Sequence, residues 1–149
     1  MIALLEAGEA NPSLGTLDKL ARALGVDFGS LVVSPPAAPL VPGTAERLPP
    51  VWEDGRGSSA RLLVSRSGMA RAELWQWELV PGARYEAEPD PPGSEEVLVV
   101  WSGHVVVEVG GNRLELGEGS YLRLPSDRPY AYLNSGEGLA RFLRAFMAG

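Results

Sequence analysis

The sequence predicts a mainly β fold preceded by a short helical segment. Residues 1–33 carry a helical pattern of apolar positions, and six of the thirteen prolines fall within residues 34–50. From about Val51 onward, short apolar runs alternate with glycine-containing turns, which is typical of strands. Because repeated prolines stop helices and favour extended geometry, we expect two separately folding parts. The expected boundaries are a helical segment at 1–33, a proline-rich linker at 34–50 and a β domain at 51–149.

The helical segment has its clearest pattern at residues 16–24. Its apolar residues recur at the i, i+3, i+4, i+7 spacing of a helix with one apolar face: Leu17, Leu20, Ala21 and Leu24. Gly25 follows at the position where helices commonly end in a left-handed residue. We expect the helix to end there and one further turn to form at residues 27–32.

The β domain contains two blocks of glycine, proline and acidic residues, with strands between them. The first block runs from Gly82 to Gly103, and the second from Gly119 to Asn134. Two apolar runs, EVLVVWS and HVVVEVG, are predicted strands, because Ser-Gly joins them and Gly-Gly-Asn signals a hairpin after the second. A chain of 149 residues with 45% hydrophobic content is long enough to bury one such core.

The two-block pattern resembles the two conserved motifs of the cupin superfamily. Members of that family are double-stranded β-helices, small jelly-roll barrels of two sheets. The resemblance implies that the His, His, Glu and His ligands of the cupin metal correspond here to four residues: Glu88, Asp90, Glu96 and Tyr130. Carboxylates and a phenol cannot replace imidazole for Fe, Ni, Cu or Zn, so we expect no cofactor. Asp127 stands where the family usually has glycine, and we expect it to turn because aspartate tolerates left-handed geometry.

Strand alternation outlines a cavity, because residues two apart on a strand share a face. We expect an effector-binding cavity lined by eight residues: Glu88, Asp90, Glu96, Leu98, Tyr130, Tyr132, Trp75 and Trp77. The two tryptophans are open to a second interpretation, as packed core aromatics rather than a stacking wall for a ligand. Trp101 is opposite in phase to Glu96, so we expect it outside the cavity, at an inter-subunit or inter-sheet surface.

Three interpretations of the acidic residues stay open. In the first, Glu88 and Asp90 are solvated in a proline-broken loop, and Glu96 pairs with one of three arginines: Arg84, Arg123 or Arg128. In the second, the carboxylates and Tyr130 orient a small organic effector that carries an amine or hydroxyls. In the third, a hard cation such as Ca, Mg or Mn is held by all-oxygen ligands: Glu88, Asp90, Glu96 and Tyr130.

The helical segment resembles the C-terminal half of a phage-repressor-like (Xre-type) helix-turn-helix domain. The string LLEAGEANPSLGTLDKLARALGVDFGSLV keeps the pattern E-x-G-x-x-x-P-S-x-x-T-L-x-x-L-A-x-A-L-G-V in register from Glu6 to Val26. In that family the base-reading residues lie on the recognition helix and the helix before it, so we expect an N-terminally truncated domain. DNA binding by this chain is expected to be weak or absent, because acidic residues outnumber Lys19 and Arg22 in the segment.

Together the two resemblances imply a transcriptional regulator whose cupin domain binds a small-molecule effector and forms a homodimer. The alternatives are a stand-alone cupin enzyme of isomerase or oxygenase type, and a dimerisation module that senses nothing. An enzyme is disfavoured because the chain has no cysteine and its one histidine, His104, lies outside both blocks. With a net charge of −6, no signal-peptide pattern and no long apolar run, we expect a soluble cytoplasmic protein without a membrane partner.

Overall fold

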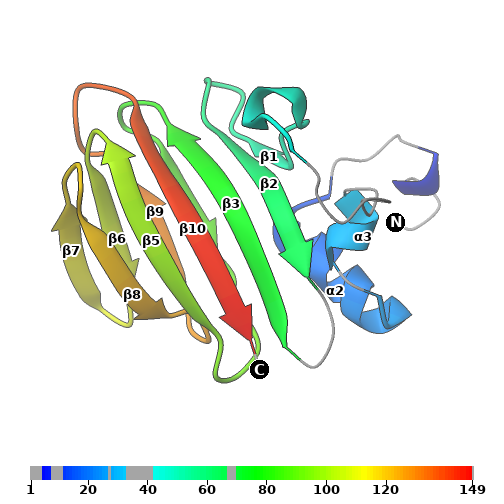
Figure 1. Cartoon of the computed structure of the whole chain (residues 1–149). Helices are drawn as coiled ribbons and strands as arrows, with labels where there is room; N and C mark the ends of the chain where they lie inside the picture. Colours follow the sequence, from blue (N-terminus) through cyan, green and yellow to red (C-terminus); the bar gives the residue numbers. More distant parts are fainter. Residues whose placement is uncertain (1–4, 8–11, 27, 33–41, 67–69, 149) are drawn as a thin grey trace.

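The computed structural model describes residues 5–7, 12–26, 28–32, 42–66 and 70–148. Two antiparallel sheets enclose the interior, and the helices lie beside β2, on one side of the sheets (Figure 1). The predicted mainly β fold of two packed sheets is confirmed, as is the short helical region before it. None of the helices in these ranges is long and apolar enough to cross a membrane.

The elements follow one another in the order expected from the sequence. The helical elements are α2 (Leu14–Leu24), α3 (Phe28–Val32) and the 3-10 turn η1 (Ala45–Arg47). The strands are β1 (Trp52–Glu53), β2 (Ser59–Arg66), β3 (Arg71–Leu79), β4 (Arg84–Ala87), β5 (Glu95–Ser102), β6 (Val105–Val109), β7 (Asn112–Leu116), β8 (Tyr121–Pro125), β9 (Tyr130–Leu133) and β10 (Ala140–Ala148). Within the described part, one sheet has the order β1-β2-β3-β10-β5-β8 and the other the order β4-β9-β6-β7.

Helix α2 begins two residues before the predicted start, because Ser13 caps it. The Ser13 hydroxyl oxygen accepts a hydrogen bond from the backbone N–H of Thr16 at 3.1 Å, which satisfies an amide that the helix leaves free. Gly25 ends the helix with a φ of 66°, as predicted. The predicted linker contains η1, and its first residues, up to 41, lie outside the described ranges.

The predicted turns of the β domain are present at their glycines. Gly110 and Gly111 have φ angles of 55° and 80° and connect β6 to β7 in a tight hairpin. Gly103 has a φ of 77°, and a Cβ there would lie 2.8 Å from the carbonyl oxygen of Leu139. The chain bends at Asp127 and Arg128, as expected, but not through left-handed geometry, because no non-glycine residue in the described ranges has a positive φ. The Asp127 carboxylate accepts a hydrogen bond from the Gly93 N–H at 3.3 Å.

The interior of the larger sheet is arranged in rows across neighbouring strands. Trp77, Phe142 and Val100 pair across β3, β10 and β5, and all three are fully buried. In the next row toward one end of the barrel, Arg144 stands between Trp75 and Leu98. A charged residue therefore lies on the inner face of β10, in the position that an apolar residue occupies one row away.

The helices share the buried core with the end of the barrel. Ala21 of α2 and Phe28 of α3 are 1% and 3% exposed and belong to the same cluster as the barrel's apolar residues. The ring of Phe28 lies 5.7 Å from that of Trp75, and Leu14 and Leu17 pack against the same cluster. The helical segment thus covers one mouth of the barrel.

Candidate functional site

A buried carboxylate, that of Glu96, organises the polar interior of the barrel. Glu96 is fully buried on the inner face of β5. Its Oε1 accepts hydrogen bonds from Arg144 Nε and from the Tyr130 hydroxyl, the latter at 2.7 Å, and forms an ion pair with Arg144 Nη2. Its Oε2 accepts from the Tyr132 hydroxyl. The carboxylate is therefore paired with a cation and hydrogen-bonded on both oxygens, the arrangement that makes a buried charge tolerable.

Arg144 supplies the positive charge at this site. Its guanidinium lies 5.6 Å from the centres of the Trp75 and Phe146 rings, and its Nη2 lies 3.4 Å from the Tyr130 hydroxyl and 3.8 Å from Asp90 Oδ2. Burial is the largest single influence on the pKa of Arg144 and lowers it, but Glu96, together with Tyr130, Tyr132 and Asp90, outweighs burial, so the net shift is upward. We call Glu96, Arg144, Tyr130, Tyr132 and Asp90 the Glu96–Arg144 cluster.

The three arginines suggested by the sequence as partners of Glu96 all pair elsewhere, so that part of the first interpretation is wrong. Arg84 binds Glu86 and Glu108, Arg123 binds Glu95, and Arg128 binds Asp127. All three side chains are substantially exposed and lie outside the barrel interior. The missed signal was the alternation in β10, which puts Arg144 on one face with Phe142 and Phe146.

The two tyrosines of the cluster act as hydrogen-bond donors. Burial raises the pKa of both the Tyr130 and the Tyr132 hydroxyl well above the ordinary value, and the nearby Glu96 carboxylate raises both further. Each hydroxyl therefore stays protonated at neutral pH and donates a hydrogen bond to Glu96. Both tyrosines come from β9 of the smaller sheet, so the cluster joins the two sheets.

Asp90 is the cluster member that faces open space. Its side chain is 19% exposed, and the Tyr130 hydroxyl lies 3.5 Å from its Oδ2. Burial raises the pKa of Asp90 to about 6; Arg144 opposes this shift and Glu96 adds to it. The pKa of this carboxyl group therefore lies close to physiological pH.

The four positions that match the cupin metal ligands do not converge on one point in this structure. Asp90, Glu96 and Tyr130 surround the guanidinium of Arg144, which occupies the place between them. Glu88 points away and binds Nζ of Lys19 at 2.7 Å. Within the described ranges, no group of three or more His, Cys, Asp or Glu side chains could hold a metal ion. Because the guanidinium fills the place between these oxygen donors, and because the donors include no imidazole, the four residues fit neither a transition metal nor a hard cation.

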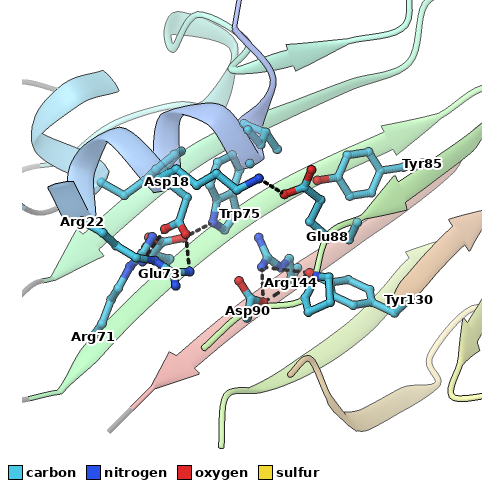
Figure 2. A pocket seen from close by; sticks show the side chains of 16 residues that line it. Asp18, Arg22, Arg71, Glu73, Trp75, Tyr85, Glu88, Asp90, Tyr130 and Arg144 are labelled. Carbon is cyan, nitrogen blue, oxygen red and sulfur yellow. Dashed lines mark hydrogen bonds and ion pairs between the residues drawn. The ribbon is translucent and has the colours of Figure 1, made fainter. Parts of the chain in front are cut away.

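A cavity of about 120 Å³ opens at the barrel mouth beside the cluster. Figure 2 shows Asp90, Tyr130, Tyr85 and Trp75 around it, with Asp18 and Arg22 of α2 on the other side. Four of the eight residues expected to line the effector cavity do so: Glu88, Asp90, Trp75 and Tyr130. The other four lie behind it and are fully buried: Glu96, Leu98, Tyr132 and Trp77. Trp101 is 39% exposed and lies outside the cavity, as expected.

A second polar group at the mouth was not anticipated from the sequence. Glu73, which is 5% exposed, accepts from Arg71 Nη2 at 2.7 Å and from Trp75 Nε1 at 2.9 Å. Arg71 also donates to Asp18 of α2 at 2.7 Å. The usable signal was that Glu73 shares the inward face of β3 with Trp75 and Trp77, where an unpaired charge would be costly.

Replacing Arg144 by methionine is expected to destabilise the protein by about 3–5 kcal/mol, because Glu96 would keep a buried charge without its partner. In the double variant Glu96→Gln/Arg144→Met no buried charge is left alone, so the loss should be smaller than the sum of the two single losses. Chemical denaturation of the four proteins measures this difference. Arg123→Met, which breaks an exposed ion pair, is the control and should change stability little. Additive losses in the double variant would contradict the pairing.

Asp90 predicts a specific pH dependence of stability. Because its pKa rises from an ordinary value of 3.8 to about 6 in the folded protein, its contribution is fully present below about pH 4 and is lost as pH rises through 6. The loss is at most about 3 kcal/mol. Asp90→Asn should therefore gain stability relative to the wild type as pH rises, in urea titrations at several pH values. Asp127→Asn should show the opposite slope, because Arg128 lowers the pKa of Asp127. Parallel curves for the wild type and Asp90→Asn would contradict the assignment.

Comparisons with known proteins agree with both parts of the architecture. A helix-turn-helix family model matches residues 1–31, and a cupin domain model matches residues 75–146. The chain is 26% identical over 143 residues to the HTH-type transcriptional regulator SutR of Escherichia coli K12, covering 95% of this chain and 75% of SutR.

Solved structures give the same picture. The cupin domain of an XRE family transcriptional regulator from Enterobacter cloacae is 25% identical, with a TM-score of 0.58 over 62% of this chain and 97% of that domain. An HTH_3 family transcriptional regulator from Vibrio cholerae matches all of this chain and 79% of its own, with a TM-score of 0.71 at 22% identity, which shows a shared fold. A predicted oxalate decarboxylase from Thermotoga maritima likewise shares the fold, with a TM-score of 0.53 at 20% identity over 62% of this chain and 81% of its own. The chain therefore carries a helix-turn-helix match at residues 1–31 and a cupin domain match at residues 75–146, and it is a homologue of an HTH-type transcriptional regulator.

Proposed function

We propose that the cupin domain of this transcriptional regulator senses a small-molecule effector in the cavity at the barrel mouth. The observation that carries the proposal is the position of Asp90 and Tyr130, which present polar atoms to this cavity and are held from behind by Glu96 and Arg144. Small-molecule sites combine such a concave surface with a few fixed polar groups. The effector is held in place by Asp90 and Tyr130, with Trp75 as an apolar wall.

The site is built for binding rather than for catalysis. Arg144 and Glu96 neutralise each other, and their partners fill the positions that in an enzyme of this fold would hold a reactive metal. His104, the single histidine, is exposed in the turn after β5, outside the cavity lining. No residue near Asp90 forms the nucleophile–base pair that acyl or group transfer requires, within the part of the chain that the structure describes. The likeness to an oxalate decarboxylase concerns the fold and does not favour an enzyme.

The second partner is duplex DNA, bound through the helix-turn-helix domain. Residues 1–31 match that family, and two-fold symmetric regulators of this type bind half-sites with a matched pair of domains. Effector binding in the cupin domain changes the positions of the two helix-turn-helix domains of the dimer relative to the two DNA half-sites.

The pairing surface is the outer face of the larger sheet, and its occupant is a second copy of this chain. Four large apolar side chains are exposed there on β5, β8 and β10: Val99, Trp101, Tyr121 and Met147. The Glu95–Arg123 ion pair lies on the same face. In a two-fold symmetric dimer, the carboxylate of each copy can pair with the guanidinium of the other copy. Isologous pairing through one such face is the commonest symmetry of soluble oligomers and gives the two-fold arrangement that DNA half-sites need.

A thermal-shift screen of cytoplasmic metabolites tests the sensing role. An effector present at 100 times its dissociation constant should stabilise the wild type by about 2.7 kcal/mol. Tyr130→Phe should lose this stabilisation, because the variant removes one polar contact and almost no volume. Tyr121→Phe removes an equivalent hydroxyl from the exposed outer face and should keep it. If no metabolite shifted the melting temperature, the barrel would be better described as a dimerisation module.

Sedimentation velocity tests the pairing surface. The wild type should sediment as a dimer, and Trp101→Glu should sediment as a monomer, because a charge would be buried against its symmetry mate. Leu114→Glu places the same charge on an exposed apolar position of β7, in the other sheet, and should remain dimeric. A dimer that persists in Trp101→Glu but is lost in Leu114→Glu would move the interface to the smaller sheet.

A further inference from the structure

We infer that the effector site is shared between helix α2 and the barrel mouth and that its ligand is a small organic ammonium ion held by Asp90. Ligand binding and the docking of α2 on the barrel then strengthen each other. The inference rests on the proposed sensing function. It adds the chemical class of the ligand and assigns helix α2 as the cavity wall that couples ligand binding to the helical segment. Figure 2 shows the arrangement, with α2 above the cavity and the barrel strands below it.

Helix α2 is fixed to the barrel by two ion pairs, one on each side of the cavity. Asp18 Oδ1 lies 2.7 Å from Arg71 Nη1, and both side chains are largely buried, with 17% and 22% exposure. Lys19 Nζ lies 2.7 Å from Glu88 Oε2, but both groups are exposed, so this pair contributes less. The two pairs connect successive residues of α2 to β3 and to the segment after β4.

Apolar contacts make the same connection below the ion pairs. Ala21 is buried on the inner face of α2, and the Phe28 ring of α3 packs against Trp75. The Trp75 ring also contacts the guanidinium of Arg144, which lies over its face. One side chain of the cavity wall therefore contacts both the helical segment and the Glu96–Arg144 cluster.

The charges around the cavity select a cation. Four acidic and four basic side chains line it: Asp18, Glu73, Glu88, Asp90, Lys19, Arg22, Arg71 and Arg144. Three of the carboxylates have a cation partner within 2.7 Å. Asp90 is the exception among them: its nearest cation, Arg144 Nη2, is 3.8 Å away and is already bonded to Glu96. An ammonium group would supply the close cation that Asp90 lacks. It would donate hydrogen bonds to the Asp90 carboxylate and to the oxygen of the neighbouring Tyr130 hydroxyl.

The size of the cavity limits the rest of the ligand. A cavity of about 150 Å³ holds a benzene molecule, so 120 Å³ accommodates about four or five non-hydrogen atoms inside the mouth. Leu14, Ala87 and the Tyr85 ring supply apolar lining for a short carbon chain. A primary amine with a short alkyl stem satisfies both the charge and the volume.

Because α2 forms one wall, the ligand binds best when the helix is docked. A ligand with higher affinity for the docked form shifts the equilibrium toward it, and docking raises the affinity by the same factor. Occupancy of the barrel is in this way converted into the position of the helix-turn-helix segment.

The ligand class is tested with three probes of similar size on the full chain: propylammonium, propan-1-ol and propionate. Propylammonium should raise the melting temperature and bind in calorimetry, whereas the neutral and anionic probes should not. Asp90→Asn should lose this binding. If propionate or propan-1-ol bound as well as propylammonium, or if a metabolite from the screen bound at the mouth while propylammonium did not, the ammonium assignment would be overturned and the sensing role would stand.

The shared site is tested by placing the same substitution on opposite faces of α2. Ala21→Phe forces a large ring into the buried helix–barrel contact without changing any charge at the cavity, and Ala23→Phe puts it on the exposed face. Ala21→Phe should weaken propylammonium binding about tenfold or more, and Ala23→Phe should leave it within about twofold. Circular dichroism checks that the barrel remains folded in both variants.

Amide hydrogen exchange of the wild type provides a readout that needs no variant. Adding propylammonium should slow exchange in Leu14–Leu24 as well as in the strands of the mouth. Equal affinities in Ala21→Phe and Ala23→Phe, or protection confined to the barrel strands, would show a site made by the barrel alone. No binding by any probe or any metabolite would instead remove the proposed sensing function itself.

Discussion

The structure depends on the buried ion pair between Glu96 and Arg144. A guanidinium presents several donors in a fixed plane, so one arginine can bond a carboxylate and still reach a phenol and a second carboxylate. Glu96 and Arg144 come from the larger sheet, and Tyr130 and Tyr132 from the smaller one, so the pair ties the sheets together near the mouth. Removing either charge alone would leave the other buried in a low-dielectric interior. At the positions that the cupin resemblance assigns to metal ligands, the chain thus supplies a cation of its own, the guanidinium of Arg144.

The same pair determines what the mouth of the barrel can bind. Arg144 forms its close ion pair with Glu96. Asp90 is partly exposed, and its charge is balanced only weakly by Arg144, at 3.8 Å. Outward from Arg144, the Trp75 ring contacts Phe28, and Glu73 links Trp75 through Arg71 to helix α2. The walls of the cavity at the mouth, the cluster behind it and the helical segment are therefore in continuous physical contact. Any ligand that fills the cavity touches surfaces from both parts of the chain.

Much of the fold could be predicted because its determinants are local. Turn glycines such as Gly103 need a positive φ, and alternation along β5 gives the inward face of Glu96 directly. The partner of Glu96 could not be predicted in the same way, because Arg144 is 48 residues further along the chain and strand pairing decides which arginine reaches it. Glu88 illustrates the same limit: its position in the chain matches a metal ligand, but Lys19 from the distant helix binds it.

The central claim is that Arg144 replaces the metal, and elemental analysis of the purified full chain tests it most directly. Protein prepared without chelators and without added ions should contain no stoichiometric Fe, Ni, Cu or Zn, because the guanidinium occupies the place between the oxygen donors and those donors include no imidazole. One such metal per chain, lost in Glu96→Ala, would contradict the account and show that Glu96 binds a metal in solution instead of Arg144.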